Sequence, residues 1–137
     1  MKAVEDYKEY MESALVLALR CRGEPRIGVV ITSNNTVLTT AYRGEMRDIQ
    51  DPVRIAIVKA EEHAVDLGHS TLYITHEPDV SSVDYIVNAQ IRRVIIGVRN
   101  PESDDAIIEL LRKGVNVGRG VLEDKIKEYI PSASCPK

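Results

Sequence analysis

The sequence predicts an α/β fold, a three-layer α/β/α sandwich built on a five-stranded mixed sheet. Two observations predict it: short β-branched runs bounded by Gly, Pro and Asn, and longer segments in which apolar residues recur every three or four positions. After the first two runs, helix and strand patterns alternate to the end of the chain. Strands that helices separate run parallel in one sheet, because crossovers are almost always right-handed, and the helices then cover both faces.

The first part of the chain predicts a helix, a hairpin and a second helix. One apolar stripe predicts an amphipathic helix over residues 3–20. Two β-branched runs, over residues 27–32 and 36–42, flank a Ser-Asn-Asn turn, which predicts an antiparallel hairpin. An Asp-Pro step and a later Gly bound a second helix over residues 52–67.

The second part predicts strands and helices in alternation. The run at 93–98 is apolar almost throughout, as expected for a strand that is buried on both faces. Asp79 and Ser103 are capping residues that start two of the helices. The expected elements are a strand over 71–75, a helix from Asp79 to Ala89, a strand over 93–98, a helix from Ser103 to Gly114, a strand over 115–117 and a helix over 121–129.

Length and composition predict an ordinary globular protein. The chain has 137 residues, enough for a single domain over 1–137 with its own core, and residues 131–137 are expected to be a flexible tail. It has neither an apolar run of membrane-spanning length nor a signal-peptide pattern at its start, so we expect a cytoplasmic protein without membrane contacts. Cys21 and Cys135 stand alone in the sequence and are expected to be reduced thiols.

Charge argues against a general nucleic-acid binder. The formal net charge is -3, which gives no overall attraction for a polyanion. Phe and Trp are absent and the six Tyr are scattered, so no stacking surface for single strands is visible. Nucleic acid is therefore not expected as a partner.

Several segments, in the same order, resemble one protein family. Residues 71–78 resemble a strand that leads into a Glu-Pro-Cys motif, residues 86–97 resemble the helix and strand that follow it, and residues 25–30 resemble the first strand. By these segments the chain resembles the cytidine deaminase-like superfamily, within it the deaminase domain of bacterial riboflavin biosynthesis and the tRNA adenosine and deoxycytidylate deaminases. The resemblance implies the sandwich fold, a nucleotide or heterocyclic ligand and a homo-oligomer, at least a dimer.

The positions of that family's zinc signature can be recognised in the chain, but other residues occupy the ligand positions. A His-x-Glu at the start of one helix and a Pro-Cys-x-x-Cys at the start of the next supply the zinc ligands and a proton-shuttling glutamate. Laid on this signature, Lys59 takes the place of the histidine and Glu61 that of the glutamate. Asp79 and Ser82 take the places of the two cysteines, and Glu24 that of a substrate-contacting asparagine. The resemblance thus implies a degenerate metal site.

Zinc in such a site needs ligands of the His and Cys type and one open position for water. A protonated Lys59 cannot bind the metal, and the hydroxyl of Ser82 is a poor ligand. We therefore expect no metal and no other cofactor.

Lys59 is open to two interpretations. A desolvated lysine is an amine nucleophile that forms Schiff bases, and Glu61 would then move the proton. The favoured alternative is an ammonium that pairs with Asp79 and Glu61, since losing the partner of a buried charge costs about 3–5 kcal/mol. Asp79 and Ser82 would then satisfy amides at the start of their helix.

Three further residues are expected to line the pocket. Ligand sites of open α/β sheets lie beyond the carboxyl ends of strands. His76 and Glu77 follow the strand over 71–75 directly, and Glu24 precedes the first strand.

The first hypothesis is a deaminase-fold protein without zinc and without hydrolytic deaminase activity, which acts as a nucleotide- or heterocycle-binding or regulatory oligomeric module. The alternative is a metal-independent enzyme that acts on a nucleotide, pyrimidine or pterin-like heterocycle through Lys59, Glu61 and Asp79. A third hypothesis places magnesium or manganese between Asp79, Glu61 and His76, and the charge of Lys59 disfavours it.

Overall fold

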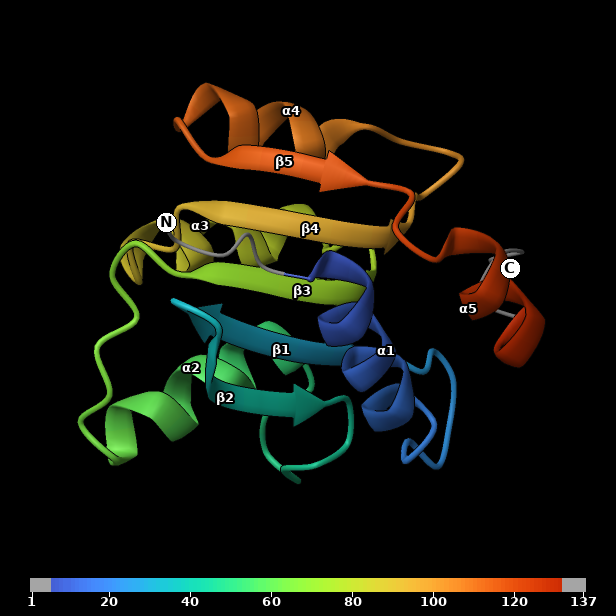
Figure 1. The fold of residues 1–137 in the computed structure, drawn as a ribbon, viewed down its shortest axis with the longest axis horizontal. Coiled ribbons are helices and arrows are strands. Elements are labelled where there is room, and N and C mark those ends of the chain that lie inside the picture. Colours follow the sequence, from blue (N-terminus) through green and yellow to red (C-terminus); the bar gives the residue numbers. More distant parts are fainter. Residues whose placement is uncertain (1–5, 132–137) are drawn as a thin grey trace.

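The computed structural model describes residues 6–131 and shows the expected α/β architecture (Figure 1). The sheet has the strand order β2-β1-β3-β4-β5. Its strands are β1 (Gly28–Ser33), β2 (Thr36–Tyr42), β3 (Thr71–His76), β4 (Arg93–Val98) and β5 (Asn116–Arg119). The helices are α1 (Tyr7–Ala18), α2 (Pro52–Glu62), α3 (Val80–Asn88), α4 (Asp105–Arg112) and α5 (Glu123–Tyr129).

The strand directions determine which chain segments meet at one edge of the sheet. β1 runs antiparallel to both β2 and β3, whereas β3, β4 and β5 are parallel. Val29 at the start of β1 is opposite Ile74 near the end of β3, and His76 is opposite Val98 at the end of β4. The loop before β1 therefore lies beside the carboxyl ends of β3 and β4.

The helices cover both faces of the sheet, as predicted. In Figure 1, α1 lies in front of the sheet, and α2 and α3 lie behind it. Because strand side chains alternate between the faces, neighbouring residues enter two different cores. The core on the α2, α3 and α4 side takes Val29, Ile31, Leu72, Ile74, Val94 and Ile96 from the sheet, and the core on the α1 and α5 side takes Val30, Tyr73 and Ile95.

Close packing of α1 on the sheet depends on one glycine. A Cβ added at Gly28 would lie 1.9 Å from the backbone oxygen of Ala14. Only a residue without a side chain allows the backbones of α1 and β1 to approach this closely.

The predicted end of the second helix is wrong. α2 ends at Glu62 rather than at residue 67, because Ala64 takes a left-handed conformation with φ 55° and the amide of Val65 bonds back to the Ala60 oxygen. The sequence contains no Gly at that point, so the stop was not visible in it. β5 covers Asn116–Arg119 rather than 115–117, a shift of the kind expected for a short edge strand.

Some predictions concern residues outside the described range. The start of the first helix at 3–5, the tail after residue 131 and Cys135 belong to this group. α1 begins at Tyr7, where the Asp6 carboxylate accepts the amides of Lys8 and Glu9 at 3.1 and 3.2 Å. None of the helices within residues 6–131 has the length and apolar character to span a bilayer.

Candidate functional site

A cavity of about 490 Å³ opens beyond the end of β3, between the starts of α2 and α3. Open α/β sheets commonly bind ligands at such a place, beyond the carboxyl ends of strands. The volume falls in the usual range for small-molecule sites. The polar lining residues are Arg43, Gln50, Asp51, Glu77, Asp79, Ser81 and Ser82.

Asp51 joins the two helices that begin at this cavity. Its Oδ1 accepts the Val53 amide at 2.9 Å and so caps α2, and Pro52 occupies the first helical position. Its Oδ2 accepts a hydrogen bond from the Ser82 hydroxyl, in the first turn of α3, at 2.5 Å. One carboxylate therefore lies between two helix N-termini, where the helix dipoles favour a negative charge.

The carboxylate of Asp79 does not cap its helix. Asp79 is the N-cap residue of α3 by its backbone conformation, but its side chain makes no capping bond and is exposed. The predicted role of Asp79 and Ser82 in satisfying helix-end amides is therefore wrong for both side chains, because the Ser82 hydroxyl donates to Asp51 instead. The Asp79 carboxylate borders the cavity, where a ligand can reach it.

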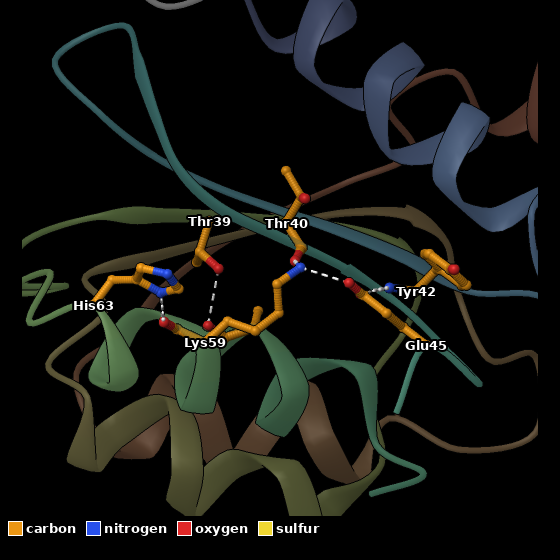
Figure 2. Close-up of polar contacts among 7 residues, drawn as sticks. Thr39, Thr40, Tyr42, Glu45, Lys59 and His63 are labelled. Atoms are coloured by element: carbon orange, nitrogen blue, oxygen red, sulfur yellow. Dashed lines mark hydrogen bonds and ion pairs between the residues drawn. The ribbon is translucent and has the colours of Figure 1, made fainter. Parts of the chain in front are cut away.

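Lys59 extends toward β2 (Figure 2) and is not among the residues that line this cavity. Its Nζ donates to the Thr40 oxygen at 2.6 Å and to Glu45 Oε2 at 2.7 Å. The predicted pairing of Lys59 with Asp79 and Glu61 is therefore wrong. Lys59 follows Asp51 by eight helical residues, which places it about 12 Å farther along the axis of α2.

Glu61 borders a different hollow. It is exposed and lines a space of about 150 Å³ together with Val65 and Leu67. The three carboxylate and imidazole groups of the third hypothesis, Asp79, Glu61 and His76, are not assembled. In the described part of the chain, no three or more His, Cys, Asp or Glu residues form a group that could hold a metal ion.

His76 and Glu77, at and after the end of β3, do line the site region. Glu77 borders the main cavity, and both residues border a smaller chamber of about 190 Å³ beside it. Burial raises the pKa of Glu77, against a smaller opposite effect of the Asn100 amide, which donates to its Oε1 at 3.0 Å. Burial lowers the pKa of His76 to about 4, with a smaller opposite effect of the Glu24 charge.

Glu24 lies near these groups without lining either space. Its side chain is half exposed and pairs with Arg26 at 3.3 Å, and the next residue, Pro25, lines both spaces. Its charge reaches His76, as the pKa of the imidazole shows.

Sequence reasoning missed Asp51, Arg43 and Gln50 as site residues. Asp51 was recognised only as a helix start, although the family signature places its metal ligands at helix starts. That signal was available, because the Asp-Pro step predicted the beginning of α2 correctly. Arg43 donates to Gln50 Oε1 at 2.8 Å within an irregular loop, which no periodicity reveals.

The fold and the cavity define a class, α/β sandwiches with a ligand site where two helices begin beside the central strand. Residues 4–98 match the family described as the cytidine and deoxycytidylate deaminase zinc-binding region, and the chain belongs to this family.

Individual relatives agree with this assignment. A tRNA-specific adenosine deaminase of Buchnera aphidicola subsp. Baizongia pistaciae (strain Bp) is 29% identical over 100 residues, which cover 67% of this chain and 61% of that protein. The chain thus spans less than two thirds of the length of this curated relative.

Solved structures show the same similarity. A diaminohydroxyphosphoribosylaminopyrimidine deaminase/5-amino-6-(5-phosphoribosylamino)uracil reductase from Thermotoga maritima is 26% identical, with a TM-score of 0.82 over 91% of this chain and 39% of that one. The dCMP deaminase of cyanophage S-TIM5 is 19% identical, with a TM-score of 0.73 over 82% of this chain and 95% of that one, and shows the fold alone.

Proposed function

We propose that this deaminase-family chain binds an amino-bearing nitrogen heterocycle of the nucleobase type and does not deaminate it with zinc. The observation that carries the proposal is the 2.5 Å hydrogen bond from Ser82 Oγ to Asp51 Oδ2 at the two helix starts. It identifies the residues that meet where the family signature has its metal ligands.

The family's zinc signature aligns better with this chain when its helix starts are matched than when its glutamate is matched to Glu61 near the end of α2. On this alignment Asp51 corresponds to the histidine and Val53 to the catalytic glutamate, eight positions before Lys59 and Glu61. Asp79 and Ser82 keep the cysteine positions. The alignment explains why Asp51, Asp79 and Ser82 line one cavity, whereas Lys59 bonds to Thr40 and Glu45 elsewhere.

The aligned residues do not suit zinc hydrolysis. They supply two carboxylates and one hydroxyl, whereas catalytic zinc in this family needs histidine and cysteine ligands. The hydroxyl already donates to one of the carboxylates. Val53 is fully buried and has no group that can move a proton to or from a substrate.

The lining favours a ligand with hydrogen-bond donors. Asp79 and Glu77 offer carboxylate oxygens, and Asp51 has lone pairs beyond its two described bonds. Amino and ring N–H groups of a nitrogen heterocycle match such acceptors. The relatives act on amino-bearing bases, as their names state, which supports the same ligand class.

The test combines metal content, ammonia release and binding. We expect the purified protein, incubated with zinc, to retain no stoichiometric metal by elemental analysis and to release no ammonia from cytosine, cytidine or dCMP. A variant carrying Asp51→His, Val53→Glu, Asp79→Cys and Ser82→Cys restores the signature and should bind one zinc. Stoichiometric zinc or ammonia release with the unaltered chain would refute the proposal.

The metal-independent enzyme has less support. Its three residues lie in three places, since Lys59 bonds to Glu45, Glu61 borders the small hollow and Asp79 borders the main cavity. Borohydride trapping of Lys59 with a carbonyl-bearing heterocycle would revive that alternative.

We also propose that the chain self-associates through α4. Ile108 and Leu111 are 51% and 56% exposed, and their spacing places them side by side on the helix surface. Sedimentation should show an oligomer that Leu111→Glu converts to a monomer. A monomer at all concentrations would contradict this proposal and leave the ligand site unaffected.

A further inference from the structure

A chamber of about 190 Å³ adjoins the main cavity and shares Glu77 and Asp79 with it, together with the loop that precedes β1. The rest of its wall comes from His76 and from residues 98–101 after β4. Because the two spaces have these residues in common, the chamber lies directly beside the main cavity.

His76 contributes a buried nitrogen without a hydrogen-bond partner among residues 6–131. The residue is 8% exposed, and its Nε2 is the unpaired atom. Its Nδ1 lies 2.8 Å from Thr75 Oγ1, which already accepts the Gly28 amide at 3.1 Å. That hydroxyl keeps its own proton and one lone pair, and Nδ1 is the acceptor within reach of the proton. With the proton donated to Nδ1, the neutral imidazole carries its own proton on Nε2.

The imidazole is neutral at pH 7, because burial lowers its pKa to about 4 while the Glu24 charge opposes this shift less strongly. Nε2 is itself covered by neighbouring atoms. A ligand would reach Nε2 through a rotation about χ2, a soft torsion in histidine, which exchanges the contact with Thr75 Oγ1 for one with the ligand. A buried donor without an acceptor is unfavourable, which favours a ligand that supplies one.

The surroundings decide which acceptor fits. Glu77 and Asp79 border the chamber, and Arg99, the cation in its wall, already pairs with Asp104 at 3.4 Å. A phosphate or carboxylate would meet these carboxylates at short range, whereas a neutral carbonyl oxygen would not. The donor on His76 and the acceptors on Asp79 and Glu77 together match a ring that carries both a carbonyl and an amino group.

We propose that His76 is a specificity-determining residue that donates a hydrogen bond from Nε2 to a carbonyl oxygen of the bound heterocycle. The proposal rests on the proposed function, since it assigns one contact of the ligand in that site. This hydrogen bond from His76 selects aminopyrimidinone-type rings over amino heterocycles without a carbonyl.

The test uses two probes, cytosine and 4-aminopyrimidine, with binding measured by ligand-observed NMR titration. Both carry the amino group, and only cytosine has the carbonyl and its lactam N–H. The unaltered protein should bind cytosine at least about tenfold more tightly, the effect of one hydrogen bond. His76→Leu should reduce this preference about tenfold and leave the 4-aminopyrimidine affinity unchanged. His76→Gln, which keeps a donor, should retain part of the preference.

His63→Leu serves as the matched control, because His63 is exposed, borders neither space and should not affect the preference. Equal binding of both probes to the unaltered protein, or an undiminished preference in folded His76→Leu, would overturn the role of His76 and leave the proposed function intact. Binding of neither probe would overturn both proposals.

Discussion

Replacing Asp51 by Ala tests whether one carboxylate holds the two helix starts together. The substitution removes the cap on the Val53 amide, which is worth about 1 kcal/mol. It also leaves the hydroxyl of Ser82, which is 3% exposed, without its acceptor, at a cost of about 1–3 kcal/mol. We expect the free energy of unfolding to fall by about 2–4 kcal/mol in all, and the melting temperature by roughly 8–16 °C.

Urea unfolding followed by circular dichroism measures this loss, and a double-mutant cycle with Ser82→Ala isolates the shared bond. The two residues should be coupled by about 1–2 kcal/mol, because the double variant leaves no buried hydroxyl without a partner. Asp79→Ala is the matched control, an acidic residue at the neighbouring helix start whose side chain makes no capping bond, and should change stability by about 0.5 kcal/mol or less. Additive effects of Asp51→Ala and Ser82→Ala would refute the reasoning.

Three further predictions follow from contacts elsewhere in the fold. Lys59→Met should lower the free energy of unfolding, measured in urea, by about 1–2 kcal/mol, because it leaves a carbonyl and a carboxylate without their donor. Its cytosine affinity should be unchanged, and lost binding would contradict the placement of Lys59 outside the site. The free energy of unfolding should fall by up to about 3 kcal/mol as the pH drops from about 6.5 to 4, because the unfolded chain protonates His76 before the folded one does. If the free energy of unfolding of His76→Leu falls with pH just as steeply, this account is wrong. Gly28→Ala should lower the melting temperature strongly, because its Cβ meets α1 backbone, whereas Gly23→Ala, with open space around it, should not.

The fold was predictable from the sequence because its signals are local and repeated. The β-branched and apolar runs of β1, β3 and β4 and the helix start at Asp51-Pro52 each identify an element without knowledge of its neighbours. The end of α2 was not predictable in this way, since Ala64 adopts a left-handed conformation that sequence patterns assign to Gly or Asn.

The site was predictable only in part. His76 and Glu77 line a chamber in the structure, because the end of β3 fixes their position. The assignment of Lys59 came from matching residue types to a motif by its acidic residue, whereas the side chains that meet are set by where the helices begin. An acidic residue that follows an alanine occurs by chance in many helices, so the motif match carried little positional information.

The bond from Lys59 to the Thr40 oxygen bears on how β2 avoids pairing with extended segments of other molecules. β2 is the outermost strand on its side of the sheet, and an outermost strand offers unpaired backbone groups to any other extended chain. A lysine that bonds to a β2 carbonyl, with Glu45 holding its ammonium in place, sets a charged side chain against this strand and makes it a poorer template for intermolecular pairing. Lys59, for which the sequence allowed a catalytic role, would thus protect against aggregation. Its replacement should first lower the soluble fraction of the expressed protein.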